Sequence, residues 1–436
     1  MTEKILPQWM THTPPQLHSR VGYDKKVIGS WAMFDFAMGS FSTTMVVFIF
    51  PIYFHDVIVQ NGHGDAYWGL TVFGSMLLVA LITPLLGAMA DVLHNKKLYL
   101  GIFAATVVTC TASLYFVQPG MVLVAALLFL FANAGYEGGL VFYDAFLPEI
   151  TTPASFGRVS GMGFAFGYVG SLAILLMSIP FLDDASRKTT FLITAADYAL
   201  CAIPLFLFVP EIRRKESIRF GTLVQRGFGQ LRTTIGHIRN YKDVSRFLAA
   251  FFIYNDGILT VVAFSGIYSK GTLHFGTIDL AIFFIMIQVV AILGSLLFGK
   301  FADARGPKLA IQITLLMWIV VAVFAFFATT KTTFYGVGFL AGLALGSCQA
   351  CSRSLMALLT PPQHTAEFFG FYDGFAGKAS GIIGPLVFGV LSELFGSQRP
   401  AILAIAAFFI AGFFLLSSVR EQRADGELGQ IKFETT

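Results

Sequence analysis

The sequence predicts an all-α integral membrane protein in which twelve transmembrane helices form two pseudo-symmetric six-helix bundles. Three observations lead to this fold class. Hydrophobic residues make up 56% of the 436-residue chain and charged residues only 12%, whereas soluble proteins carry about 25% charged residues. Apolar runs long enough to cross a bilayer recur along the whole chain. A short loop containing Gly, Asp and basic residues occurs twice, once in each half.

The apolar runs fall into two sets of six. A membrane-spanning helix needs about 20 mostly apolar residues. In the first bundle, residues 28–210, we expect helices at 28–54, 67–90, 98–117, 121–147, 158–180 and 190–210. In the second bundle, residues 244–419, we expect helices at 244–269, 279–301, 309–329, 333–358, 367–394 and 399–419.

The segment 211–243 between the bundles is polar and strongly basic. It holds eight basic residues and three acidic ones. The basic residues are Arg213, Arg214, Lys215, Arg219, Arg226, Arg232, Arg239 and Lys242. Because loops rich in Lys and Arg stay in the cytoplasm, we expect a cytoplasmic linker here. The tails 1–27 and 420–436 then lie on the same side, and a bacterial chain would sit in the inner membrane. The first tail lacks the apolar core of a signal peptide.

The repeated loop joins the second and third expected helices of each bundle. Gly87, Asp91 and Lys96 of the first copy recur at one constant offset as Gly299, Asp303 and Lys308. A second set of residues recurs further along the chain, at an offset that is larger by one residue. It relates Pro148, Gly157 and Gly161 to Pro361, Gly370 and Gly374. A register that persists over so much of the chain indicates duplication of a six-helix unit.

Each repeated Asp is expected at the cytoplasmic end of its helix, followed by the basic residues Lys96 and Lys97 or Arg305 and Lys308. A carboxylate there can accept hydrogen bonds from the free N–H groups at the start of another helix. We expect Asp91 to bond the start of the eleventh span and Asp303 the start of the fifth. Such bonds would latch the cytoplasmic side shut. The alternative is a plain turn with a solvated Asp.

The fifth and eleventh spans are unusually rich in glycine and correspond to each other in the repeat. Their glycines are Gly157, Gly161, Gly163, Gly167 and Gly170 in one, and Gly370, Gly374, Gly377, Gly381 and Gly384 in the other. Small residues four apart allow helix backbones to approach closely in lipid. Tight static packing and a sliding contact between the bundles both account for this pattern.

The loop resembles the signature G-x-x-x-D-x-x-x-x-[RK]-[RK] between helices two and three of the major facilitator superfamily. The chain from about 27 to 420 further resembles the branch of the fungal vacuolar amino-acid effluxers and their bacterial relatives. The motifs that carry this resemblance are Trp31-Ala-Met-Phe-Asp35, Phe50-Pro51-Ile-Tyr53, Tyr143-Asp144-Ala-Phe-Leu-Pro148-Glu149, Tyr254-Asn255-Asp256-Gly257, Ser352-Arg353-Ser354, Glu367-Phe-Phe-Gly370-Phe-Tyr372 and Gly377-Lys378-Ala-Ser380. The chain departs from that branch at Met38-Gly39, where Asn-Ser is expected.

Ionisable side chains inside the spans are costly unless they are paired or face a cavity, so each is a functional candidate. Near the middle of the membrane we place Glu137, Asp256 and Lys378. Because a low dielectric disfavours a charged carboxylate, the two acids are candidate proton carriers. Lys378 would hold a substrate carboxylate or neutralise Asp256. Polar residues expected at similar depth are Asn133, Tyr136, Tyr254, Asn255 and Gln288.

Other ionisable residues lie closer to the cytoplasmic ends of their spans. Asp35 is about 10 Å into the first span by helical rise and is kept among the substrate or proton candidates. A salt-bridge network around the repeated loops is expected from Asp144, Glu149, Arg158, Arg353, Glu367 and Asp373. Asp197, in the sixth span, has no functional interpretation.

These residues predict a secondary active transporter, not an enzyme, that moves a small polar solute by alternating access. The resemblance favours an amino acid or related zwitterion, and the buried carboxylates favour proton coupling. An uncoupled facilitator or an exporter of an organic anion, a siderophore-like or a nucleoside-like solute remains open, as does, more remotely, a membrane receptor or enzyme on this fold.

Cofactors and partners beyond the solute, protons and lipid are not expected. The four cysteines, Cys110, Cys201, Cys348 and Cys351, lie in apolar segments without metal-ligand spacing. We therefore expect no metal and no cofactor, no nucleic-acid partner and a monomeric protein.

Overall fold

The computed structural model describes residues 24–60, 63–181, 186–211, 220–236, 241–271, 273–381 and 383–421. Within these residues it is all-helical and contains twelve helical segments long and apolar enough to cross a membrane. They run in the order expected from the sequence, six before the linker and six after it. The tails 1–23 and 422–436 and the linker segments 212–219 and 237–240 lie outside the described residues.

The first half contains spans one to six. Their helices are α1 (Lys25–Phe41), α2 (Ile49–Tyr53), α3 (Gly64–Leu93), α4 (Lys96–Ser113), α5 (Val122–Asp144), α6 (Leu147–Ile150), α7 (Phe156–Ser178) and α8 (Thr189–Phe208). The first span also includes two π-helical turns, η2 (Ser42–Val47) and η3 (Phe54–Ile58). Within this half α1 packs on α7 and α8, and α5 packs on α3 and α4.

The second half contains spans seven to twelve. Its helices are α10 (Lys242–Gly271), α11 (Thr277–Arg305), α12 (Pro307–Phe327), α13 (Lys331–Leu359), α14 (Thr365–Phe369), α15 (Gly377–Ala379), α16 (Ile383–Leu394) and α17 (Gln398–Ser417). Here α13 packs on α11 and α12, and α17 packs on α10 and α12. Three of these pairs, α13–α11, α13–α12 and α17–α10, correspond to α5–α3, α5–α4 and α8–α1 of the first half, as duplication of one six-helix unit requires.

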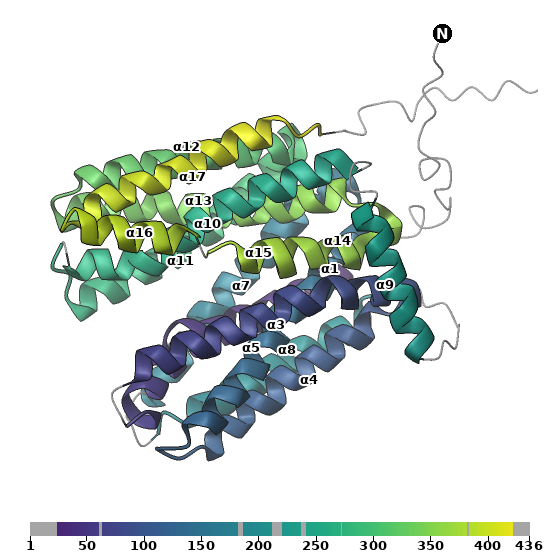
Figure 1. The fold of residues 1–436 in the computed structure, drawn as a ribbon, viewed down its shortest axis with the longest axis horizontal. Coiled ribbons are helices and arrows are strands. Elements are labelled where there is room, and N and C mark those ends of the chain that lie inside the picture. The colour runs from purple at the N-terminus through teal and green to yellow at the C-terminus, as the bar shows by residue number, and fades with distance from the viewer. Residues whose placement is uncertain are drawn as a thin grey trace, which may run out of the picture.

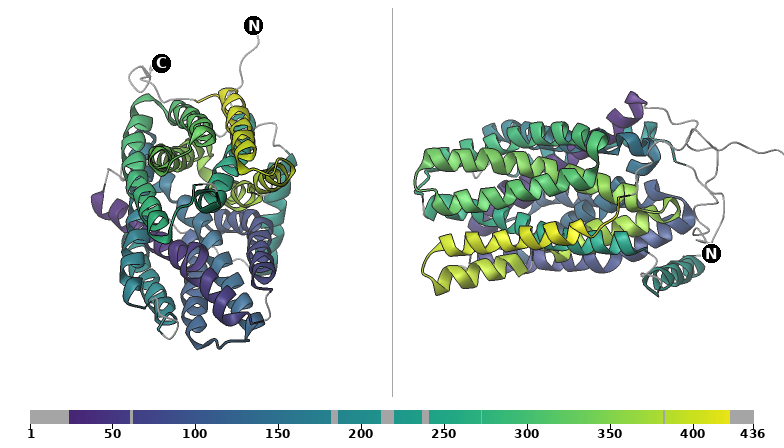
Figure 2. Two further views of the ribbon diagram at one scale, coloured as in Figure 1. Left: turned by 90° about the vertical axis from the view of Figure 1, so that its left-hand side faces the viewer. Right: turned by 90° about the horizontal axis from the view of Figure 1, so that it is seen from above.

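The two halves lie side by side with their helices roughly parallel (Figures 1 and 2). Two pairs of spans join them. Helix α7 packs on α11 and α13, and α3 packs on α14 and on the π-helical segment η9 (Gly370–Ala376). The interface between the halves is therefore built mainly from spans two, five, eight and eleven.

The eleventh span is not the continuous helix that the sequence led us to expect at 367–394. It begins as α14, passes through the π-helical η9 and the short α15, and is interrupted after Ala379 before α16 resumes at Ile383. Ser380 has an extended backbone and Gly381 has a φ of +85°. A side chain at Gly381 would be strained in this left-handed region, so glycine allows the chain to break here.

The linker contains a helix that the sequence analysis did not predict. Helix α9 (Phe220–Gly236) lies at the end of the bundle where α14 begins, and it runs across the spans rather than along them (Figure 1). It packs against α3. We call this end, which also carries Asp91 and Asp303, the linker end.

Candidate functional site

At the linker end Asp91 joins the two halves. Its carboxylate, at the end of α3, accepts hydrogen bonds from the backbone N–H groups of Ala366 (3.1 Å) and Glu367 (2.8 Å) in α14. These N–H groups belong to the first turn of a helix, where they have no partner within the helix. Asp91 is only 7% exposed, so the contact is largely removed from solvent. This is the partner that the sequence predicted for Asp91.

Asp303 makes the corresponding contact on the other pair of spans. At the end of α11 it accepts from the backbone N–H groups of Gly157 (2.7 Å) and Arg158 (3.2 Å), where α7 begins. The Nε of Arg158 adds an ion pair of 3.1 Å. The predicted partner of Asp303 is therefore also present. Arg305 is exposed at the end of α11 and makes none of these contacts.

The basic residues of the two loops do not correspond as the sequence offset suggested. Lys96 reaches across to the second half, where its Nζ contacts Thr365 Oγ1, and it also bonds Glu149 Oε1 at 2.6 Å. Lys308 stays in its own half, with its Nζ on the carbonyl oxygens of Ser417 (2.9 Å) and Val419 (2.6 Å).

Lys97, rather than Lys96, is the structural equivalent of Lys308. The Nζ of Lys97 bonds the Phe206 carbonyl oxygen at 2.9 Å, and its backbone N–H bonds Glu211. The backbone N–H of Lys308 likewise bonds Glu421. The pairing changes because two residues separate α3 from α4, whereas the single residue Gly306 separates α11 from α12.

Glycines bring the same spans into backbone contact. A Cβ at Gly157 or Gly161 of α7 would collide with the backbone carbonyl of Gly299 or Ser295 in α11. In the eleventh span a Cβ at Gly370 or Gly374 would collide with Thr83 and its neighbour on α3. A Cβ at Gly163 would meet Asp35 of its own half and Arg353 of the opposite half, and the other expected glycines face their own half or the break. The two glycine-rich spans thus use one short stretch each to approach the opposite half.

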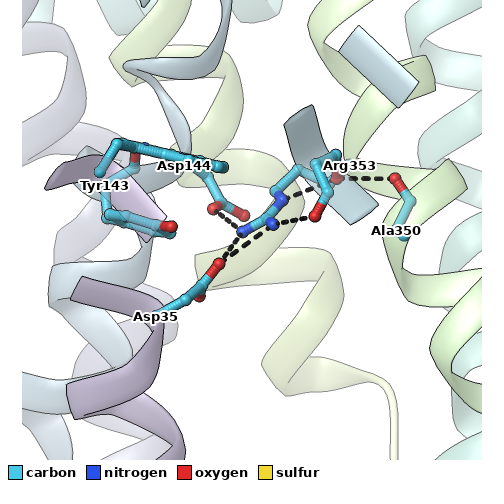
Figure 3. A network of polar contacts seen from close by, with 7 residues as sticks. Asp35, Tyr143, Asp144, Ala350 and Arg353 are labelled. Atoms are coloured by element: carbon cyan, nitrogen blue, oxygen red, sulfur yellow. Dashed lines mark hydrogen bonds and ion pairs between the residues drawn. The ribbon is translucent and has the colours of Figure 1, made fainter. Parts of the chain in front are cut away.

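A buried ion cluster centred on Arg353 lies between the halves (Figure 3). Arg353, on α13 of the second half, is 1% exposed. Its Nη1 bonds Asp35 Oδ2 (3.1 Å) and Asp144 Oδ1 (2.8 Å), both from the first half. Its Nη2 bonds Asp35 Oδ2 (3.1 Å) and the Ser160 carbonyl oxygen (2.7 Å), and its Nε bonds Ser160 Oγ (2.9 Å). Every N–H of the guanidinium has a partner in the other half.

Aromatic rings from the first half enclose the same guanidinium. Its carbon lies 4.1 Å from the ring centroid of Phe164 and 4.8 Å from that of Trp31. Trp31 in turn stacks on Tyr143 at 4.6 Å and donates to the Tyr143 carbonyl oxygen. Arginine suits this site and lysine does not, because only the planar guanidinium group can stack on these rings and offers five N–H donors in a fixed geometry. Asp35 therefore belongs to this cluster, although the sequence placed it with the substrate candidates.

Asp373 extends the cluster from the eleventh span. Asp373 lies near Asp144, across the boundary between the halves. One carboxylate oxygen of Asp373 is buried and has no hydrogen-bond partner among the described residues.

Near the middle of the spans Glu137 and Lys378 form an ion pair between the halves. Glu137, on α5, contacts the Nζ of Lys378, on α15. The Lys378 side chain is 16% exposed and that of Glu137 7%. The sequence left Lys378 to bind a substrate or to neutralise Asp256, and the structure pairs it with Glu137 instead.

Asp256 is the cap of the broken eleventh span. From α10 its Oδ1 accepts the backbone N–H of Gly381 at 2.8 Å, and its Oδ2 accepts that of Gly384 at 2.9 Å. The carboxylate thus satisfies N–H groups that the interruption leaves without helical partners. The sequence pattern Ser380-Gly381 followed by Gly384-Pro385 was a signal for this break.

Near the break, three polar residues form a short network and two others form a separate pair. Asn255 Nδ2 bonds Ser380 Oγ at 2.7 Å, and Gln349 Nε2 bonds Asn255 Oδ1 at 3.3 Å. The Tyr254 hydroxyl lies 2.7 Å from Ser352 Oγ.

The other polar candidates are divided between the halves. Asn133 bonds Ser75 Oγ at 2.8 Å within the first half, where Tyr136 stacks on Phe41. Gln288 is half-buried on α11 and makes none of these contacts. Asp197 accepts a bond from Cys201 on its own helix.

No group of three or more His, Cys, Asp or Glu side chains suited to a metal occurs among the described residues. The arrangement is instead two bundles joined by carboxylates, helix starts and ion pairs. Each of these contacts can break without breaking a helix. Such a structure can open at one end while it stays closed at the other, which is how transporters with repeated halves work.

Solved structures of major facilitator superfamily transporters have the same fold as this chain. The human organic anion transporter MFSD10 aligns with a TM-score of 0.71 and 15% identity over 90% of this chain and 99% of that chain. The E. coli fucose:proton symporter FucP aligns with a TM-score of 0.68 and 14% identity over 91% and 98%.

Within that superfamily the chain belongs to the vacuole effluxer Atg22-like family, whose model matches residues 70–429. An uncharacterized MFS-type transporter of Bacillus subtilis, YxiO, is 32% identical over 411 residues, 90% of this chain and 94% of that protein. Autophagy-related protein 22 of Saccharomyces cerevisiae is 25% identical over 420 residues, 85% of this chain and 76% of that protein. The branch inferred from the sequence motifs is therefore confirmed.

Proposed function

We propose that the protein moves a small zwitterion, most simply an amino acid, by alternating access coupled to protons. The observation that carries this proposal is the ion pair between Glu137 and Lys378. It provides one carboxylate and one ammonium group side by side, each on a different half. An amino acid carries the complementary pair of charges.

A zwitterion would replace the ion pair by binding between its members. Its carboxylate would take Lys378 and its ammonium group would take Glu137. Both charges of the protein then remain paired while the direct link between the halves is lost. This exchange avoids leaving a buried charge alone, which would cost about 3–5 kcal/mol.

The linker end corresponds, in this proposal, to the cytoplasmic side. The basic linker supports this side by the positive-inside rule. The contacts of Asp91 and Asp303 close that end in the present structure. We therefore assign the structure to the state closed toward the cytoplasm.

Proton coupling is supported by the pair formed by Asp144 and Asp373. These two carboxyl groups lie near each other, one on each half, and two negative charges at such a place repel each other unless one group holds a proton. Release of the proton would place two negative charges in contact and push the halves apart. We therefore propose that Asp373 with Asp144 carries the proton, rather than Asp256, because the Asp256 carboxylate caps a helix. The name of the family as effluxers and that of FucP as a proton symporter are consistent with coupled export or import.

Transport in proteoliposomes tests the proposal. Uptake and counterflow are measured for a panel of amino acids and organic anions, with and without a pH gradient. Glu137→Gln and Lys378→Gln should each lower amino-acid transport about 30-fold, which corresponds to about 2 kcal/mol. Lys331→Gln is the matched control, because it breaks the surface ion pair with Asp279 at 2.5 Å and should leave transport unchanged.

The same panel of solutes distinguishes the proposed amino-acid transporter from a carrier of organic anions. A carrier of organic anions needs Lys378 but not Glu137, so Glu137→Gln would then spare transport. Loss of the pH-gradient effect in Asp373→Asn is expected for proton coupling. An unchanged gradient response in that variant would refute the assignment to Asp373.

A further inference from the structure

Helix α9 of the linker has three distinct faces. One stripe, Leu223, Gly227, Gln230 and Thr234, recurs at the spacing of one helix face and is turned toward the protein. Leu223 is 5% exposed and Thr234 4%. A second stripe, Val224, Phe228 and Leu231, is apolar and only partly covered, and Phe228 is 55% exposed. The remaining face is polar and holds Arg226 and Arg232, both exposed.

The protein-facing stripe contacts both halves of the molecule. A Cβ at Gly227 would meet Met89 and Leu85 of α3, close to Asp91 in the first half. Gln230 Nε2 donates to Glu367 Oε2 at 2.8 Å, at the start of the eleventh span in the second half. Helix α9 therefore spans the Asp91 contact from outside.

The hydrogen bond from Gln230 to Glu367 is important for the closed linker end because Glu367 is buried. Its side chain is fully buried, and the same Oε2 lies 3.1 Å from Nδ1 of His364. The other oxygen, Oε1, has no hydrogen-bond partner among the described residues. A buried carboxylate with so few partners depends on each of them, so removal of Gln230 would destabilise the closed arrangement.

The other two faces fit a membrane surface. The helix crosses the ends of the spans (Figure 1), which places it parallel to the bilayer plane at the level of the headgroups. Arg232 lies one turn from Phe228 beside the apolar stripe, Arg226 lies on the far side of the polar face, and the segment 220–236 contains no acidic residue. Helices of this pattern lie in the interface, with the apolar side in the acyl boundary and arginines on lipid phosphates.

We propose that α9 binds anionic phospholipid headgroups through Arg226 and Arg232, with Phe228 in the acyl boundary, and thereby holds the linker end closed. Bound to the surface, the helix keeps Gln230 on Glu367 and Gly227 on α3. Detached, it withdraws both contacts and favours opening of that end. The proposal rests on the alternating access of the proposed function, but its test measures position and opening and requires no substrate.

The position of the helix is tested with an environment-sensitive dye. The label is placed by Phe228→Cys in a background of Cys110→Ser and Cys201→Ser, and Thr222→Cys on the polar face is the matched control. In vesicles of phosphatidylcholine with phosphatidylglycerol, the dye at 228 should shift to the blue and be quenched by spin-labelled lipid. The dye at 222 should do neither. Identical behaviour of the two positions would overturn the proposal.

The role of charge is tested by lipid composition. Replacing phosphatidylglycerol by phosphatidylcholine should weaken the response at 228. Arg226→Gln and Arg232→Gln should each reduce the preference for anionic vesicles about fivefold, which corresponds to about 1 kcal/mol per arginine. Lys270→Gln removes an exposed charge at the far end of α10 and should change nothing. A response that is independent of anionic lipid would refute the proposal.

The effect on opening is tested by spin-label distances across the linker end. Leu98→Cys on α4 and Ser418→Cys after α17 are both exposed and lie in different halves. Anionic vesicles should favour the short-distance population, and the double variant Arg226→Gln with Arg232→Gln should lose that effect. If the distance distribution does not depend on lipid composition, lipid binding by α9 does not hold the linker end closed.

Discussion

Arg353 shows how one side chain can hold two bundles together. It belongs to the second half, yet every hydrogen-bond partner of its guanidinium belongs to the first. The cost of burying this charge is offset only while Asp35 and Asp144 stay beside it. Opening of the linker end must therefore either keep this cluster together or rehydrate all three charges.

Replacement of Arg353 by lysine should weaken the closed state. Lysine keeps the charge but has neither the planar fork nor the stacking surface that Phe164 and Trp31 enclose. We expect Arg353→Lys to destabilise the closed state by about 2–3 kcal/mol. Spin-label distances between Leu98→Cys and Ser418→Cys should shift toward longer values.

A control variant for this change is Lys331→Gln, which removes a charge whose side chain is 44% exposed in a surface pair with Asp279. Exposed ion pairs contribute about 0–1 kcal/mol, so the distances should not change in this variant. If Arg353→Lys and Lys331→Gln give the same distribution, the cluster does not hold the halves together.

Among the helices, α7 and the eleventh span are the contact surfaces of their halves. Each uses two glycines, Gly157 and Gly161 or Gly370 and Gly374, to reach the backbone or a threonine of the opposite half. These glycines lie within about three turns of the starts of their spans, whose N–H groups are bonded by Asp303 and Asp91. The close contacts of the glycines and the hydrogen bonds of Asp91 and Asp303 therefore lie on the same segments of these spans.

A methyl group at Gly161 should separate the halves at the linker end. The added Cβ would run into the Ser295 carbonyl oxygen, and neither backbone can yield without moving a whole helix. Overpacking of this kind costs about 1–3 kcal/mol. Gly161→Ala should therefore increase labelling of a cysteine placed at the interface from the linker end.

The matched control is Gly389→Ala in α16, where an added Cβ meets nothing within 4 Å. It makes the same chemical change in another spanning helix and should leave labelling as in the parent protein. Equal labelling in both variants would contradict a role of Gly161 in closing the interface.

Over the whole molecule, two latches related by the repeat close one end. Asp91 joins α3 to α14 and Asp303 joins α11 to α7, so each half contributes one carboxylate and one helix start. The contacts are on separate pairs of spans and share no residue. Their contributions to the closed state should therefore add.

Asn substitutions test this additivity. Hydrogen bonds to a charged group contribute about 1.5–3 kcal/mol each. Asp91→Asn and Asp303→Asn should each shift cysteine crosslinking toward the state open at the linker end, and the double variant should shift it by the sum of the two free energies. A double variant no more open than either single one would show that one latch alone closes the molecule.

The candidate site was predictable only in part from the sequence. The partners of Asp91 and Asp303 followed from local motifs, because the duplication fixes which helix start meets which carboxylate. The partner of Lys378 did not follow, since a choice between Glu137 and Asp256 depends on the rotation of three helices. The break after Ala379 and helix α9 were missed, because both lie in segments whose overall composition suggests something else.

The sequence by itself determined the twelve spans, the duplication and the family, because hydrophobic length and local motifs are properties of contiguous residues. Only the tertiary structure decided that Asp35 pairs with Arg353, that Asp256 caps a broken helix and that Lys97 is the counterpart of Lys308. Each of these depends on how helices rotate against one another. In a membrane, that rotation is set by small residues and by the pairing of buried polar groups across the whole bundle.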